Sequence, residues 1–329
     1  MRTFLFLLIS FSVFYAHADA EITKIDRISL TVSDLARTEA FFHDGLCFEK
    51  VAVKEITDPS YSHLVGVQGA KVTIMTMRVG TSLVDFVKYS KPGLPYPKGS
   101  TSPDLWFQHI AIVVPDIDKA YSHLKKVKFE AISLNGPETL PPSTGSVAAF
   151  KFRDPDGHPL ELLYFPNGQG REVWHKQPPE RLFLGLDHSA ISISSTKNSL
   201  NFYTNLIGMK WAYYSLNHGI TQEQLDGTFN AEVQITGIRP PNGLGIGMEL
   251  LDYRAPSTGR PIPKNVKCND IQNDQVEMVT DNIEKVDEAL WKAGVDYISP
   301  RIVTLKGDGP FHKALMVRDP DGHAILVEQ

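Results

Sequence analysis

The sequence predicts an α+β fold made of four copies of one β-α-β-β-β module. Three observations carry this prediction. Four segments alternate apolar and polar residues as half-buried strands do, each is followed by a polar capping residue and a run with helical spacing, and the tetrapeptide Asp-Pro-Asp-Gly occurs twice at matching places. A repeat of this size decides the organisation of the whole chain.

Each module opens with a strand and a helix. The opening strands are expected at residues 25–32, 107–114, 186–193 and 273–280. The helical runs that follow them are 35–42, 117–124, 196–206 and 282–294, and their expected N-cap residues are Asp34, Asp116, Ser195 and Asp281.

Each module closes with a pair of strands. These pairs are 72–77 with 82–89, 148–152 with 159–165, 231–237 with 245–253, and 313–317 with 324–328. The turns at 154–157 and 319–322 join the last two strands of the second and fourth modules, because Pro suits an early turn position and Gly a positive φ. We interpret their acidic residues as turn formers rather than metal ligands. His158 and His323 follow these turns and are expected to be exposed loop residues.

The N-terminal segment and one linker divide the chain. Residues 1–20 have a basic start, a short apolar run and an Ala-rich end, which is the pattern of a cleaved signal peptide; an uncleaved anchor is the alternative. Two domains are expected, 21–165 with the first two modules and 184–329 with the last two, joined by a linker at 166–183 that contains Pro and Gly. The mature protein is expected to be periplasmic or secreted, without stable insertion in a membrane.

Composition narrows the class of partner. The formal net charge is −5 and no long run of Lys or Arg occurs, so the basic stripe that nucleic-acid binding needs is missing. Cys47 and Cys268 are the only cysteines, which excludes a disulfide-rich scaffold. A small molecule is the expected partner, and the sequence predicts no particular oligomeric state.

Alignment of the four modules on their first and last strands gives two sets of equivalent positions, most of them occupied by polar residues that could bind a metal or act in catalysis. The first strands align Arg27, His109, His188 and Gln275, and the last strands align Asp85, Glu161, Glu249 and Leu326. Strand alternation puts the neighbours of these residues on the opposite face of the sheet. One His and one Glu alone are more often an ordinary core residue and a solvent-facing carboxylate, but two matched pairs favour a metal site.

The four modules resemble the vicinal oxygen chelate superfamily, which includes glyoxalase I, extradiol dioxygenases, methylmalonyl-CoA epimerase and fosfomycin-resistance proteins. The resemblance implies two cupped, mostly antiparallel sheets of the glyoxalase/dihydroxybiphenyl dioxygenase type. It also implies one divalent metal ion, Zn, Ni, Co, Mn or Fe(II), with four protein ligands. The residues that match the ligand positions are His109, Glu161, His188 and Glu249.

The pairing of modules stays open at this point. If sequence neighbours pair, Arg27 shares a cup with His109 and Glu161. If the pairing is crossed, the second module faces the third, all four ligands meet, and the first and fourth modules form a cup without a metal site. We favour the crossed pairing, because random loss would seldom leave the surviving ligands so well matched. It makes partners of the modules that carry Cys47 and Cys268, so we expect a disulfide between them.

The ligand set resembles that of glyoxalase I and of methylmalonyl-CoA epimerase more than that of the extradiol dioxygenases. The resemblance implies a metal-dependent lyase or isomerase that acts on a small oxygen-chelating substrate, with Glu161 or Glu249 as general base. An extradiol dioxygenase and a non-enzymatic small-molecule-binding or resistance protein are the alternatives.

Three further residues are weaker candidates. His218 and Arg239 lie in the third module, where they are expected either to contact substrate or to belong to a surface loop. Glu328 lies two residues beyond Leu326 and is expected to be a frayed terminal carboxylate rather than a replacement ligand.

Overall fold

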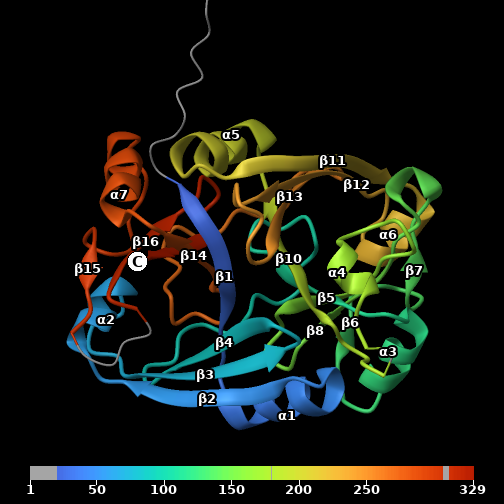
Figure 1. Cartoon of the computed structure of the whole chain (residues 1–329), viewed down its shortest axis with the longest axis horizontal. Helices are drawn as coiled ribbons and strands as arrows, with labels where there is room; N and C mark the ends of the chain where they lie inside the picture. The colour runs from blue at the N-terminus through green and yellow to red at the C-terminus, as the bar shows by residue number, and fades with distance from the viewer. Residues whose placement is uncertain (1–20, 179, 307–310) are drawn as a thin grey trace, which may run out of the picture.

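The computed structural model describes residues 21–178, 180–306 and 311–329. The predicted signal peptide, residues 1–20, lies outside this part of the chain. Two mixed sheets and short helices form the α+β fold that the sequence predicts (Figure 1). Among the described residues no helix is both long and apolar enough to cross a membrane.

One sheet, called sheet A here, takes its strands from the two ends of the chain. Its order is β15-β16-β17-β14-β1-β4-β3-β2, and in Figure 1 its strands run from blue to cyan in the first module and from orange to red in the fourth. The strands are β1 (Ile22–Thr31), β2 (Glu49–Ile56), β3 (Val72–Val79), β4 (Ser82–Tyr89), β14 (Asp274–Thr280), β15 (Val303–Thr304), β16 (Lys313–Arg318) and β17 (Ala324–Glu328).

The other sheet, called sheet B, takes its strands from the middle of the chain. Its order is β11-β12-β13-β10-β5-β9-β8-β6, and β7 also pairs with β8. The strands are β5 (Gln108–Val113), β6 (Glu130–Ala131), β7 (Glu138–Thr139), β8 (Ala148–Arg153), β9 (Pro159–Tyr164), β10 (Gly185–Ile193), β11 (Lys210–His218), β12 (Glu232–Arg239) and β13 (Gly247–Ala255).

The crossed pairing of modules is confirmed. β1 of the first module runs antiparallel to β14 of the fourth, and β5 of the second runs antiparallel to β10 of the third. Each sheet therefore contains one module from either side of the linker. The central strand pair of each sheet joins two modules, so each cup is completed only when both are present.

The helices follow the predicted caps with small differences. They are α1 (Leu35–Leu46), α2 (Pro59–Leu64), α3 (Ile117–Leu124), α4 (Glu172–His175), α5 (Thr196–Leu200), α6 (Ile220–Asp226) and α7 (Ile283–Lys292). Asp34 caps α1 by accepting hydrogen bonds from two backbone amides of its first turn. The predicted cap Asp281 is wrong by one residue, because Asn282 accepts from the Lys285 amide instead. The third predicted run is also divided, since a π-helical turn, Asn201–Leu206, follows α5.

The two Asp-Pro-Asp-Gly turns join sheet A to sheet B. Asp156, in the β8–β9 turn of sheet B, accepts hydrogen bonds from the backbone amide (2.9 Å) and hydroxyl (2.7 Å) of Ser33, which follows β1 in sheet A. Asp321, in the β16–β17 turn of sheet A, accepts the same two bonds from Ser194, which follows β10 in sheet B. This reciprocal contact explains why the fourth module keeps its turn although Leu326 has replaced the carboxylate.

The prediction that His158 and His323 are exposed is wrong. Both side chains are buried. His158 Nδ1 lies 2.8 Å from Asp154 and Nε2 lies 2.8 Å from the carbonyl oxygen of Ile271, which precedes β14. The turn at 154–157 thus brings His158 against the segment that precedes β14 of sheet A, and it is part of the contact between the sheets rather than a free loop.

The turn contacts predict a stability effect. Asp156→Ala removes the acceptor for two Ser33 donors, so the variant is expected to lose about 1–3 kcal/mol of unfolding free energy. Urea denaturation measures the loss. Asp118→Ala, an exposed carboxylate on α3, is the matched control and is expected to change stability by less than about 0.5 kcal/mol. Equal midpoints for the two variants would contradict a joining role for the turn.

The predicted disulfide is absent, and both cysteines are free. Cys47 is exposed at the C-terminus of α1, where its sulfur faces His123 of the second module at 3.5 Å. Cys268 is buried before β14, and its sulfur lies 3.8 Å from that of Met316. The first and fourth modules are partners as expected, but their cysteines have different surroundings. Cys47 faces α3 of the second module, whereas Cys268 lies in the apolar cluster of sheet A.

The prediction that Glu328 is frayed is also wrong. Glu328 is the last residue of β17, and it is paired with Val279 on one side and with Ala314 on the other. Burial raises the pKa of its carboxyl to about 7, and the Asp26 carboxylate adds to that increase. The end of the chain is therefore part of sheet A.

Candidate metal centre

Strand register brings the four predicted ligands of sheet B to one face. Along the parallel pair β5 and β9, Glu161 lies beside Ala111, two residues after His109. Along β10 and β13, Glu249 lies beside Ala190, two residues after His188. Residues two apart on a strand point the same way, so each module contributes one imidazole and one carboxylate to the same side of the sheet.

The antiparallel pair at the centre of the sheet brings the two halves of the site together. His109 lies opposite Ala190 and His188 lies opposite Ala111, which makes the two histidines diagonal neighbours. Their ring centroids are 5.7 Å apart. The structure thus collects His109, Glu161, His188 and Glu249, as the crossed pairing predicts.

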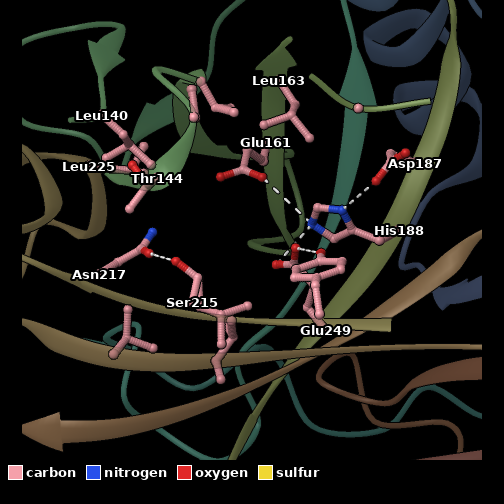
Figure 2. A pocket seen from close by; sticks show the side chains of 18 of the residues that line it. Leu140, Thr144, Glu161, Leu163, Asp187, His188, Ser215, Asn217, Leu225 and Glu249 are labelled. Carbon is pink, nitrogen blue, oxygen red and sulfur yellow. Dashed lines mark hydrogen bonds and ion pairs between the residues drawn. The ribbon is translucent and has the colours of Figure 1, made fainter. Parts of the chain in front are cut away.

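The side-chain atoms converge on one point. Glu161 Oε2 lies 3.3 Å from His109 Nε2 and 3.9 Å from His188 Nε2. His188 Nε2 also lies 3.3 Å from Glu249 Oε2. Figure 2 shows Glu161, His188 and Glu249 pointing towards one another, with Asp187 behind the His188 ring.

The two carboxylates are held differently. Glu161 is buried with both imidazoles, and His109, Glu161 and His188 form a set in which one ligand atom of each lies within 4.8 Å of the others. Glu249 stands outside this tighter set and accepts a hydrogen bond from the Tyr213 hydroxyl through Oε1. The centre is therefore two imidazoles and one carboxylate, with a second carboxylate at its edge.

The donors fit a divalent cation. Both ring nitrogens of His109 and Nε2 of His188 are buried without a hydrogen-bond partner among the described residues. Buried imidazole nitrogens are costly to leave unpaired, and two His with carboxylate oxygens suit the borderline metals named above. His188 Nδ1 lies 3.1 Å from Asp187, the carboxylate contact that commonly orients a metal-binding imidazole.

The same groups influence one another's protonation without a cation. Burial opposes ionisation of Glu161, but His109 and then Lys151 outweigh burial and lower its pKa to about 2. Burial also opposes protonation of His188, but Glu249 and Asp187 outweigh it and raise its pKa to about 9. The carboxylates and imidazoles of this centre thus favour one another's charged forms.

A cavity of about 680 Å³ lies over this centre. Its lining includes His109, Glu161, His188 and Glu249, apolar side chains such as Leu140 and Leu163, and polar ones such as Ser215 and Asn217 (Figure 2). The volume is in the usual range for small-molecule sites.

The two weaker candidates for substrate contact, His218 and Arg239, differ in their position relative to the cavity. Arg239, the last residue of β12, lines the cavity and makes no ion pair among the described residues. His218 is exposed at the end of β11 and does not line the cavity. Of the pair, only Arg239 is placed to meet a ligand.

Sequence reasoning missed four residues of the site. Asp187 directly precedes His188, and a register shift in β10 at this point lets both side chains reach the same region. Lys151 of β8 lies opposite Glu161 and donates a hydrogen bond to Asp226. The Tyr213 hydroxyl donates a hydrogen bond to Glu249. Only Asp187 had a signal in the sequence, because an acidic residue beside a candidate ligand is a common orienting partner.

Within the part of the chain that the structure describes, sheet A has no comparable centre. Arg27 Nη1 lies 3.2 Å from Asp85 Oδ2, and Arg27 Nε lies 3.9 Å from Glu277 Oε2. Leu326 is fully buried in an apolar cluster that includes Tyr61 and Met316. A guanidinium and apolar side chains thus occupy the space that the ligand set occupies in sheet B.

Glu277 makes the stability depend on pH. Burial raises the pKa of Glu277 from 4.5 to about 8, and Asp85 adds to the increase. The unfolded chain ionises first as pH rises, so this contribution to stability is present below about pH 4.5 and is lost towards pH 8. Glu277→Gln is expected to flatten the decline in urea midpoint between pH 5 and 8, whereas Glu55→Gln, at an exposed site, should leave it unchanged. An unaltered decline in the Glu277 variant would contradict this origin.

Comparison with known proteins agrees with this architecture. Residues 24–162 match the sequence model of the Glyoxalase/Bleomycin resistance protein/Dioxygenase superfamily. The matched segment covers the first and second modules. None of the curated proteins matches the chain in sequence.

Two solved structures of low sequence identity share the fold. Glyoxalase I from Zea mays aligns with a TM-score of 0.61 and 18% identity, over 93% of this chain and 92% of that chain. A putative dioxygenase from Bacillus subtilis aligns with a TM-score of 0.54 and 14% identity, over 94% of this chain and 86% of that chain. At these identities the similarity shows the fold and leaves the reaction to be argued from the site.

Proposed function

We propose that the protein is a metal-dependent lyase or isomerase of the glyoxalase type that acts on a small molecule with two adjacent oxygens. The observation that carries the proposal is the convergence of His109, Glu161, His188 and Glu249 at the floor of the cavity, with unpartnered imidazole nitrogens between the carboxylates. A divalent metal held there would act as a Lewis acid towards the two substrate oxygens and acidify the adjacent C–H bond.

The two carboxylates suit different roles. Glu161 belongs with the two imidazoles as a ligand, because one of its oxygens faces both rings. Glu249 lies at the edge of the set and the Tyr213 hydroxyl donates to its Oε1, so Oε2, which lies 3.3 Å from His188 Nε2, is the oxygen that would accept a proton. We assign Glu249 as the general base that takes the proton from one substrate carbon and returns it to the neighbouring carbon.

Proton exchange tests this assignment. Metal-loaded protein is incubated in D2O with hemithioacetals and 2-hydroxycarbonyl compounds, and deuterium uptake is followed by NMR. Glu249→Gln is expected to slow exchange about 10²–10⁴-fold while keeping bound metal, and the His218→Ala control should match the wild type. A protein that binds ligands of this class without any metal-dependent exchange or turnover would instead be the non-enzymatic binder.

A ring-cleaving dioxygenase is the second candidate, and one observation favours it. The tighter set of His109, Glu161 and His188 is two histidines and one carboxylate, which is the donor set of many non-haem Fe(II) oxygenases. Oxygen consumption by the Fe(II)-loaded protein with catechols distinguishes the two reactions. Rapid uptake with a catechol, and no exchange with the carbon acids, would replace the first assignment by the second.

A further inference from the structure

Lys151 lies at the strand position opposite the candidate carboxylate ligand of its module, and no other module has a cationic residue at the equivalent position. It lies in β8 directly opposite Glu161 of β9, and opposed residues of an antiparallel pair point to the same face. The residues that face the equivalent positions in the other modules are Thr76, Gly237 and Met316. The cation is thus confined to the module that contributes His109 and Glu161.

The ammonium group of Lys151 is buried and only partly satisfied. Its side chain is 5% exposed and lines the cavity. Nζ donates to Asp226 Oδ1 at 2.6 Å, and Glu161 Oε1 lies 4.0 Å away. An ammonium has three N–H donors, and no other hydrogen bond from Nζ is present among the described residues. Donors therefore remain for an oxygen atom in the cavity.

A structural role alone does not account for this lysine. Asp226 already accepts hydrogen bonds on Oδ2 from the Tyr253 hydroxyl (2.9 Å) and from Gln222 Nε2 (2.7 Å). Buried ion pairs seldom stabilise a protein more than apolar side chains of similar volume, because both charges must leave water. Met316 shows that the equivalent place in this fold accepts an apolar residue.

We propose that Lys151 is a substrate-binding residue, which donates to an anionic oxygen of the substrate, and that the substrate is a small carboxylate with an oxygen on the adjacent carbon. Glu161 turns Oε2 towards the imidazoles and Oε1 towards Lys151, so the ammonium lies on the side of Glu161 away from the imidazoles. The oxygen on the adjacent carbon and one carboxylate oxygen would face the metal centre, and the second carboxylate oxygen would meet Lys151. This inference rests on the proposed function.

Lactate and its uncharged methyl ester are the matched probes. Binding of each to Mn(II)-loaded protein is measured by proton relaxation. Wild type is expected to bind lactate at least about tenfold more tightly than the ester, the range for a hydrogen bond to a charged group. The double variant Lys151→Met/Asp226→Asn leaves no unpaired buried charge and is expected to lose this preference, whereas Lys151→Arg should keep most of it. Lys119→Met, on the surface of α3, should resemble wild type.

Two results would overturn the inference. One is an unchanged preference for lactate in the double variant that folds and holds one equivalent of metal. The other is loss of the preference in Arg239→Leu but not in the Lys151 variants, which would assign anion binding to the other cationic side of the cavity. Metal analysis of each sample separates these results from failure of the proposed function. If wild type held no metal, that function would fail, and the lactate preference of the metal-free protein would still test Lys151.

Discussion

His188→Ala is expected to abolish stoichiometric metal binding, and His109→Ala should do the same. Each variant removes one of the two imidazoles around Glu161 and leaves the carboxylates with a single imidazole. Loss of an orienting partner alone weakens metal sites about 10–100-fold, so loss of a ligand should exceed that range. Mass spectrometry of the purified protein measures metal per chain, and about one equivalent is expected in wild type.

The control for this experiment is within the same chain. His218→Ala removes an exposed imidazole outside the cavity and should keep the wild-type metal content. Because the two ligand histidines come from different modules, loss of metal in both variants would show that the second and third modules share one site. Full retention in either variant would remove that residue from the ligand set.

Leu326→Glu is expected to destabilise the protein without creating a second metal site. The new carboxylate would restore the residue type of the equivalent ligand positions but would lie in an apolar cluster with Tyr61 and Met316, beside Glu277 in the register of β14 and β17. Burying an unpaired charge among apolar groups costs about 3 kcal/mol or more. Urea denaturation at pH 7 measures the loss.

Leu326→Met separates packing from charge. Because it conserves volume, it should cost less than about 1.5 kcal/mol. Metal analysis of Leu326→Glu should still give about one equivalent, because Arg27 already neutralises Asp85 and one histidine position holds Gln275. Two equivalents of metal in this variant would contradict this explanation. They would show that sheet A lacks a metal site only because Leu326 stands at a ligand position.

Much of the fold was predictable, because strand alternation, caps and turns are local signals that recur four times. The crossed pairing was predictable for a different reason, since only one arrangement gathers His109, Glu161, His188 and Glu249. The environment of these residues was not predictable. Lys151 meets Asp226 only because α6 of the third module packs against β8 of the second, and such a contact leaves no periodic trace in either segment.

The errors have a common physical cause. His158 and His323 were interpreted as loop residues from their own neighbourhood in the sequence, and Cys47 was paired with Cys268 only because their modules are partners. Their surroundings are set by the other half of the molecule: Ile271 meets His158, and His123 meets Cys47. Where two sheets exchange turns, residues that look peripheral in one module become internal to the whole.

The crossed pairing also orders the assembly of the chain during synthesis. All strands of sheet B lie between residues 108 and 255, whereas sheet A needs both β1 and β14. The cup that carries the candidate metal centre is therefore complete in sequence before β14 leaves the ribosome. Until then β1 presents an unpaired edge of the kind that invites association with other chains. A chain truncated after β13 would keep every candidate ligand, but β1 would have no partner strand and the chain would be prone to aggregate. Successive C-terminal truncations should therefore lower solubility before they remove the metal ligands.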